Sequence, residues 1–328
     1  RLPIIQGTSF AFIPIMLPFK AFGLGAIFTA AFIGGIFQIW IGKILKPIRH
    51  MFPPLVTGIV VLMIGISLLK VGFKYAGGGV WLMNNKPEVF ANWEHLLIAG
   101  TVLIVALLCN LRGKGMISSA SILLGIIAGF IMAALLGQIS WGKIAAADWF
   151  ALPMPFQYGI DFVWGAVILM LFMSIVTTIE TIGDISATTM GGANREATNK
   201  ELSGGIMADG VGTAFASIFN AMPNTSYSQN AGLVAFTGVI SRHVGTVAGV
   251  ILILLGLFPK LGGIIAAMPD SVIGGAAIIM FGLIAGAGIK LISKSEMSQR
   301  NILILALSLS FGIGLYAFPE FVAHIPDF

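Results

Sequence analysis

Three acidic residues lie inside stretches of apolar sequence rather than in polar connections: Glu180, Asp184 and Asp209. Glu180 and Asp184 are four residues apart in Ile-Glu-Thr-Ile-Gly-Asp, so both project from one face of a helix. Two carboxylates this close in apolar surroundings resist being ionised together. Such a pair can take up and release a proton near neutral pH. We therefore predict that Glu180, Asp184 and Asp209 serve proton coupling.

Each of these acids also has a structural alternative. Glu180 could simply hydrogen bond one helix to another, and Asp184 could be hydrated near the end of its stretch. Asp209, in Met-Ala-Asp-Gly, could cap a helix or hold a turn. The functional interpretation is favoured for Glu180, because an unpaired acid in the middle of an apolar helix usually has a function. For Asp184 and Asp209 both interpretations stay open.

A second polar feature follows Pro223 and reads Asn-Thr-Ser-Tyr-Ser-Gln-Asn-Ala-Gly over residues 224–232. Its first part has strand-like character, so we expect extended backbone before a helix begins. The side-chain amide of Gln229 both donates and accepts hydrogen bonds, which suits the edge of a nucleobase. Gly232 allows helices to approach closely. The alternative is an ordinary helix start at which Gln229 and Asn230 pack on their neighbours.

A related segment lies near the start of the chain. The triplet Thr-Ser-Phe at 8–10 recurs as Thr-Ser-Tyr at 225–227, an offset of 217 residues. Further matches follow at an offset of 216: Pro53 with Pro269, Val56 with Val272, and Gly58 with Gly274. We expect two short strands that pair and satisfy each other's backbone groups. Phe10 would then offer a ring for stacking and a backbone amide for binding, although Phe10 alone could equally be core.

The composition defines the class of protein that must position these residues. Hydrophobic residues make up 57% of the 328 residues and charged residues 9%, whereas a soluble domain has about 25% charged residues. A helix needs about 20 apolar residues to cross a bilayer. We therefore predict an all-α, multi-pass membrane protein. Eleven apolar elements are expected, at 2–19, 21–42, 52–69, 95–110, 116–137, 162–186, 203–220, 225–240, 244–258, 270–289 and 301–318.

Several classes of function are disfavoured. The net charge of +5 does not indicate nucleic-acid binding, because Lys and Arg lie in short connections between apolar elements. Cys109 is the single cysteine and the four histidines are scattered, so we predict no disulfide, no metal site and no cofactor. The absence of a nucleophile–base pair disfavours an enzyme, and the absence of a selectivity loop disfavours an ion channel.

Charge and periodicity predict the topology. Six of the 18 Lys and Arg residues lie after odd-numbered elements, namely Lys20, Lys70, Lys74, Lys86, Lys143 and Lys260. The other twelve place residue 1 and the even-numbered connections in the cytoplasm. The repeat spans seven elements, an odd number, so the second copy must be inverted relative to the first, as in alternating-access transporters. The period also predicts two helices before residue 1 and one after residue 328.

At these residues the sequence resembles the nucleobase–ascorbate transporter family, also called nucleobase–cation symporter family 2. The family signature is Gln or Glu, Asn, any residue, Gly, four residues and Thr. It stands here as Gln-Asn-Ala-Gly-Leu-Val-Ala-Phe-Thr at 229–237 and continues to Arg242 in a form similar to xanthine and uric acid permeases. The likeness runs from 7–10 through Phe-Pro-Pro at 52–54 and Glu-Thr-Ile-Gly-Asp at 180–184 to Pro269.

The resemblance implies a homodimeric transporter of fourteen segments, of which this chain would be a fragment. A core domain would move as an elevator against a gate domain. The core would comprise residues 1–50 and 141–268, and the gate residues 51–140 and 269–328. The implied partners are a purine base, a co-transported proton (or Na⁺) and the lipid bilayer, and the implied location is the plasma (inner) membrane.

The resemblance also assigns roles to residues. Glu180 becomes the substrate-binding acid and Gln229 the second side-chain contact, with Phe10, Ser228 and Asn230 completing the binding site. The other motif or purine-branch positions are Asp184, Asp209, Thr8, Ser9, Gly232, Thr237 and Arg242.

Two positions bear on the substrate. The uracil branch of the family has Glu where Gln229 stands and His where Asp184 stands, so both residues favour a purine. We predict proton-coupled transport of xanthine or uric acid. The alternatives are a uracil-type permease and an anion transporter of the same fold, of the sulfate or bicarbonate type, against which Glu180 argues.

Overall fold

The computed structural model describes residues 2–48, 53–293, 295–318 and 320–321, most of which are helical. The chain forms two compact units. Unit 1 contains Arg1–Thr57 and Leu152–Leu257, and unit 2 contains Gly58–Ala151 and Phe258–Phe328. These divisions fall near the borders expected after residues 50, 140 and 268. Assigning the two units the roles of core and gate stays a proposal.

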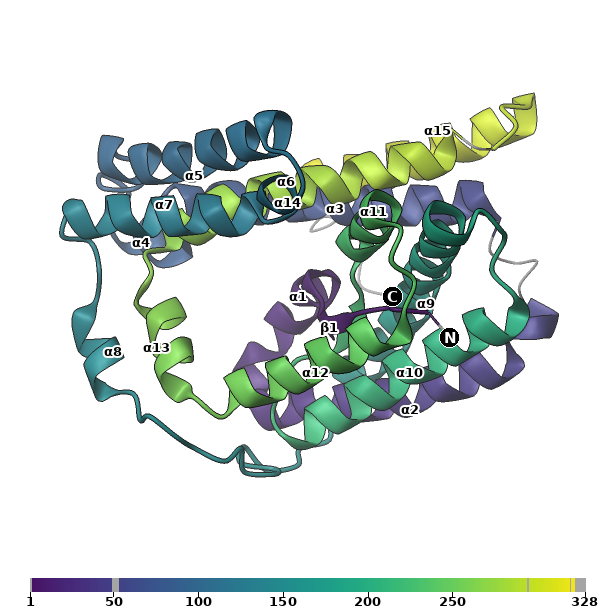
Figure 1. Ribbon diagram of the computed structural model, residues 1–328, viewed down its shortest axis with the longest axis horizontal. Helices are drawn as coiled ribbons and strands as arrows, with labels where there is room; N and C mark the ends of the chain where they lie inside the picture. Colours follow the sequence, from purple (N-terminus) through teal and green to yellow (C-terminus); the bar gives the residue numbers. More distant parts are fainter. Residues whose placement is uncertain (1, 49–52, 294, 319, 322–328) are drawn as a thin grey trace. The chain divides into compact units, whose positions relative to one another are not determined.

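Unit 1 combines long helices with two short strands. Its elements are β1 (Gln6–Thr8), the 3-10 helices η1 (Phe10–Phe12) and η2 (Leu17–Phe22) on either side of α1 (Ile13–Met16), α2 (Leu24–Ile48), α9 (Trp164–Ala193), α10 (Asn199–Ile218), β2 (Asn224–Ser226), α11 (Ser228–Thr237) and α12 (Arg242–Gly256). In Figure 1, α2 and α10 run side by side, and α9 packs against both.

Unit 2 consists of helices and their connections, with no strand among its described residues. Its elements are α3 (Pro54–Ala76), α4 (Val80–Asn85), α5 (Trp93–Arg112), α6 (Met116–Ser119), α7 (Ser121–Leu135), α8 (Trp141–Ala146), α13 (Pro259–Ala267), α14 (Asp270–Ile292) and α15 (Gln299–Ala317). Helices α5 and α7 lie side by side (Figure 1). The apolar core is formed where Ile98 and Val102 of α5 meet Val272 and Ala276 of α14.

The two strands pair as expected. They are antiparallel, with Gln6 opposite Ser226 and Thr8 opposite Asn224. The Ser9 N–H extends the ladder by donating to the Pro223 carbonyl at 3.0 Å. Because the strands are corresponding parts of the sequence repeat, their antiparallel pairing means that the two copies run in opposite directions here. The pairing satisfies backbone groups that a bilayer could not satisfy.

Close contact between α2 and α10 depends on glycine. A Cβ atom on Gly35 would lie 2.6 Å from the Ala214 nitrogen and 2.7 Å from the Gly210 carbonyl oxygen. A Cβ atom on Gly210 would lie 2.6 Å from the Gly35 oxygen. Small residues let membrane helices approach until their backbones touch. Polar side chains beside these glycines are therefore enclosed by neighbouring helices.

A short polar connection joins α9 to α10. Asn194 ends α9 in the left-handed conformation, with φ of 49°. Thr198 caps α10 and forms a capping box with Glu201, whose carboxylate also pairs with both terminal nitrogens of Arg195 at 2.6 and 2.8 Å. The connection thus ends α9 and begins α10 at defined residues.

Six described helices are long and apolar enough to cross a membrane: α2, α3, α5, α9, α14 and α15. Helix α7 is shorter but apolar, and α12 exposes a row of Val, Ile and Leu side chains, as expected for a surface in contact with lipid. Each of the eleven expected apolar elements contains at least one helix. The short helices α4, α8 and α13 were not expected, because helices of six to nine residues are too short to show a clear periodicity.

Candidate functional site

The acidic side chains of α9 and α10 converge with hydroxyl groups of β2 and α11. We call this the acid–hydroxyl cluster, and it consists of Glu180, Thr181, Asp184, Asp209, Thr225, Ser226 and Ser228. All seven residues belong to unit 1. The cluster lies where the broken helix of the second repeat copy begins again after its strand. Its members are therefore brought together by the strand pairing and by the packing of α9 against α10.

Asp184 is buried and fully paired. Its Oδ2 accepts a hydrogen bond from the Ser226 hydroxyl at 2.6 Å, and its Oδ1 accepts one from the Ser228 hydroxyl at 2.7 Å. The two donors come from the end of β2 and the first residue of α11. Asp184 thus joins the strand–helix break to α9, and it is not simply hydrated at the helix end.

Asp209 lies in the interior of α10 with no exposed surface, so it does not cap this helix, which begins at Asn199. The Thr181 hydroxyl of α9 donates to its Oδ2. Its other oxygen, Oδ1, has no hydrogen-bond partner among the described residues. A buried carboxyl oxygen without a partner is costly and calls for an explanation.

Hydroxyl groups connect the two aspartates. The Ser226 hydroxyl oxygen, bonded to Asp184, lies 3.5 Å from the Thr181 hydroxyl oxygen, which is bonded to Asp209. A continuous series of polar atoms therefore runs from α10 through α9 and β2 to α11. The two aspartates are therefore linked through hydroxyl groups, each of which can both donate and accept a hydrogen bond.

Glu180, like Asp209 and unlike Asp184, retains an unpaired oxygen. Its Oε2 is buried and has no hydrogen-bond partner within the described part of the chain. The Thr225 hydroxyl interacts with the carboxyl group but not with the geometry of a hydrogen bond, and it too is buried without a partner. Both groups lie beside the strand–helix break, where a small polar ligand could satisfy them.

The other predicted site residues are distributed around this break. Asn230 is buried, and its side-chain nitrogen donates to the Pro3 carbonyl at 2.6 Å, which ties α11 to the N-terminal segment. Gln229 follows Ser228 in the first turn of α11, and Phe10 begins η1. The side chains of Gln229 and Phe10, and any side-chain contact of theirs, lie outside the described residues.

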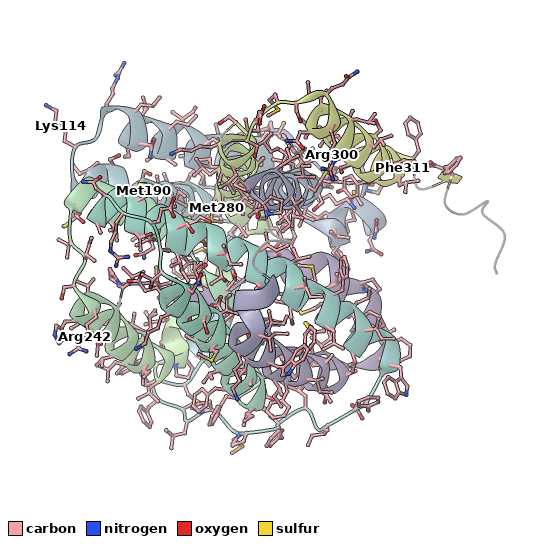
Figure 2. All side chains as sticks on the ribbon, turned by 90° about the vertical axis from the view of Figure 1, so that its right-hand side faces the viewer. Lys114, Met190, Arg242, Met280, Arg300 and Phe311 are labelled. Carbon is pink, nitrogen blue, oxygen red and sulfur yellow. The ribbon has the colours of Figure 1, made fainter. Side chains whose placement is uncertain are left out.

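The remaining motif residues lie at the ends of strands and helices or within α11. The buried Ser9 hydroxyl accepts from the Ala11 N–H at 3.2 Å, and the exposed Thr8 ends β1. The Thr237 hydroxyl bonds to its own helix, donating to the Leu233 carbonyl at 2.8 Å. Arg242 is exposed at the start of α12, where Figure 2 shows it at the surface. Gly232 lies within α11, and its packing is outside the described residues.

Sequence reasoning missed three members of the cluster. Thr181 stands between the two acids of α9, but a threonine in an apolar helix carries no signal of its own. Thr225 and Ser226 were recognised only as strand formers. Their positions relative to the acids follow from the packing of β2 against α9 and α10, which no local pattern encodes.

A cavity of about 520 Å³ in unit 1 lies beside this cluster without containing its carboxyl groups. It is lined by the N-terminal segment up to Gln6 and by the first turns of α10, including Lys200 and Gly205. The Gln6 amide donates to the Gly205 carbonyl at 3.2 Å. We place the candidate site at the unpaired Oε2 of Glu180 and hydroxyl of Thr225 rather than in this cavity. A buried polar atom without a hydrogen-bond partner is the stronger sign of a ligand.

Together, the apolar helices, the paired strands between broken helices and the buried acids define a multi-pass membrane transporter. A family model described as the Permease family matches residues 1–321. The chain belongs to this family, the nucleobase–ascorbate transporters.

Three relatives show the extent of the likeness. A permease of Clostridium perfringens is 38% identical over all of this chain and 71% of its own length. Xanthine permease XanP of Escherichia coli is 33% identical over 98% of this chain and 72% of its own. Uric acid permease PucJ of Bacillus subtilis is 34% identical over 99% of this chain and 73% of its own.

Two solved structures share the fold. The transmembrane domain of the cyanobacterial bicarbonate transporter BicA has a TM-score of 0.62 and 17% identity, covering 96% of this chain and 83% of its own. SLC26A9 has a TM-score of 0.64 and 14% identity, covering 98% of this chain and 57% of its own. These similarities confirm the predicted fold class of membrane transporter, and at this level of identity they carry information about the fold alone.

Proposed function

We propose that this protein is a proton-coupled symporter for a purine base, xanthine or uric acid, with Glu180 as the acid that binds the substrate. The observation that carries the proposal is the buried, unpaired Oε2 of Glu180 beside the unpaired hydroxyl of Thr225. A carboxylate accepts hydrogen bonds from the N–H groups of a purine. The names of the relatives, which include xanthine and uric acid permeases, support this choice of substrate.

The substrate would lie against the break between β2 and α11. The amide of Gln229 would form the second side-chain contact, and the backbone at Phe10 and Ser228 would complete the site. The hydroxyl of Ser228 is already bonded to Asp184, so its backbone is the part available to a ligand. Asn230 would act mainly by holding α11 against Pro3.

The proton would be shared within the acid–hydroxyl cluster. Protonation together with substrate binding would remove net charge from the buried acids, which lowers the cost of moving unit 1 through the membrane. In this proposal unit 1 is the core that moves as an elevator, unit 2 is the gate, and two copies of the chain associate through their gates. Coupling to Na⁺ instead of H⁺ is tested by replacing Na⁺ in the uptake buffer.

The fold also suits an anion transporter, since BicA is named for bicarbonate. Glu180 disfavours this alternative, because sulfate and bicarbonate have no N–H group from which a carboxylate could accept a hydrogen bond. Uptake assays with xanthine, uric acid, uracil, sulfate and bicarbonate separate the candidates. Saturable uptake of sulfate or bicarbonate without uptake of a purine would contradict the proposal.

The decisive variant is Glu180→Gln, which keeps the size of the side chain and removes its charge. Loss of a hydrogen bond to a charged group costs about 1.5–3 kcal/mol, so we expect purine uptake to fall by about 10- to 100-fold and proton-driven accumulation to disappear. Glu196→Gln, at an exposed position of unit 1, is the matched control and should behave as the wild type. Proton-driven accumulation that persists in Glu180→Gln would exclude the assigned role.

A further inference from the structure

Gln38 lies in the middle of α2 with no exposed surface. Neither its amide nitrogen nor its amide oxygen has a hydrogen-bond partner among the residues that the structure describes. Burying a polar group without a partner costs free energy, and nearly all buried polar groups are paired. A leucine would fill the same place without that cost. The position of this amide therefore requires a functional explanation.

The neighbours of Gln38 on α2 show where its side chain points. One turn before it, the Gly34 carbonyl accepts from the Ser174 hydroxyl of α9 at 3.1 Å. One turn after it, the Gly42 carbonyl accepts from the Ser203 hydroxyl of α10 at 2.6 Å. Residues four apart lie on one helix face, so Gln38 faces the interior between α9 and α10.

Asp209 reaches the same interior from α10. The residue after it, Gly210, touches α2: a Cβ atom there would lie 2.7 Å from the nitrogen of Ile39, the residue after Gln38. Asp209 also faces α9, because it accepts a hydrogen bond from Thr181. Gln38 and Asp209 thus lie at the same level of the three packed helices, and the amide of one and the Oδ1 of the other are both buried and unpaired.

The chemistry of the two groups is complementary. The NH₂ group of an amide donates to an ionised carboxylate, and the carbonyl of the same amide accepts from a protonated carboxyl group. We propose that Gln38 is the positioning residue for Asp209 and pairs with this acid in both of its protonation states. Rotation of the amide by half a turn exchanges the two modes. Asp209 can then gain or lose a proton inside the membrane without being left unpaired.

This inference takes its meaning for transport from the proposed function, but the pairing itself can be tested without transport. In thermal unfolding of the purified protein, Gln38→Leu should lower the Tm of the wild type, because it removes the partner of Asp209. In an Asp209→Ala background, where no carboxyl group is left to pair, Gln38→Leu should not lower the Tm. We expect the two effects to depart from additivity by at least about 2 °C. Effects that simply add would overturn the pairing.

Thr188→Val provides the matched control. Thr188 is buried on α9, and its hydroxyl also lacks a partner in the described part of the chain, but it lies two turns beyond Thr181. Its effect should add to that of Asp209→Ala. If Thr188→Val and Asp209→Ala departed from additivity as much as Gln38→Leu and Asp209→Ala do, the coupling would be a general consequence of burying polar groups. That result would overturn the specific role of Gln38.

A second variant tests the link to protonation. The titratable groups that act on Asp209 are Glu180 and Asp184, both on α9. Gln38→Glu adds a carboxyl group from α2, and two facing carboxyl groups share one proton. We expect purine uptake to be kept at acidic pH and its decline to move by at least about one pH unit toward alkaline pH relative to the wild type, because the shared proton is lost only at higher pH. Gln38→Leu should lose uptake at every pH, whereas Thr188→Val should keep the wild-type profile.

A pH profile of Gln38→Glu that coincides with that of the wild type would overturn the role in proton coupling. If the wild-type protein carries no purine base, the proposed function fails, whereas the thermal measurements still decide whether Gln38 pairs with Asp209.

Discussion

Replacing Thr181 by valine tests the connection between the acids of α9 and α10. Valine keeps the branched shape and removes one hydroxyl group. That hydroxyl donates to Asp209, so its loss leaves both oxygens of a fully buried carboxyl group without a described partner. A hydrogen bond to a carboxylate contributes about 1.5–3 kcal/mol. For a chain of this size each 1 kcal/mol changes the Tm by about 2 °C, so we expect a decrease of about 3–6 °C.

The matched control for this variant is Thr177→Val. Thr177 is equally buried and lies one turn earlier on α9, but its hydroxyl donates only to the carbonyls of Met173 and Ser174 in its own helix. Its replacement should change the Tm by about 2 °C or less. Thermal unfolding of the purified protein and proton-driven purine uptake measure the two variants in parallel. Equal losses in Thr181→Val and Thr177→Val would refute the reasoning, because Thr181 would then have no special link to Asp209.

Two further predictions concern packing and pH. Gly35→Val places a Cβ atom 2.6 Å from the Ala214 nitrogen, so we expect the amount of folded protein in the membrane to fall. In Gly249→Val the new Cβ atom meets no atom within 4 Å, so this control should fold normally. Fluorescence-detected size exclusion measures both variants. The Arg195 guanidinium holds the pKa of the Glu201 carboxyl well below its usual value, so this pair stabilises the fold above pH of about 4.5 and loses its effect as the pH falls further. Arg195→Gln should therefore lower the Tm slightly at pH 7, and the Tm of the variant should decrease less than that of the wild type as the pH falls below about 4.5. The effect is small because Arg195 is exposed. An equal decrease of the Tm in acid for both proteins would contradict this prediction.

The helices were predictable because their signal is local. The stretches around α3 and α14 are long and apolar, and both begin after proline at corresponding positions of the repeat. The strands were predictable for another reason: a polar segment following Pro223 recurs near the start of the chain, and two such segments in a membrane have to satisfy each other's backbone groups.

The candidate site was predicted only in part. Glu180 and Asp184 stood out because acids are rare in apolar helices, and their spacing placed them on one face. Nothing in the sequence showed that Asp184 would be paired on both oxygens while Glu180 would keep one oxygen unpaired. This difference arises from the position of β2, which brings Ser226 to one acid and Thr225 to the other.

The sequence by itself determined that this chain crosses a membrane, repeats its architecture and holds acids in apolar surroundings, because hydrophobicity, periodicity and charge are properties of residues read along the chain. Only the tertiary structure decided which buried polar atoms find partners. Hydrogen bonding depends on distances of about 3 Å between residues far apart in sequence, such as Asp184 and Ser226 or Thr181 and Asp209. Those distances are set by the packing of helices at small residues, and no spacing along the chain encodes them.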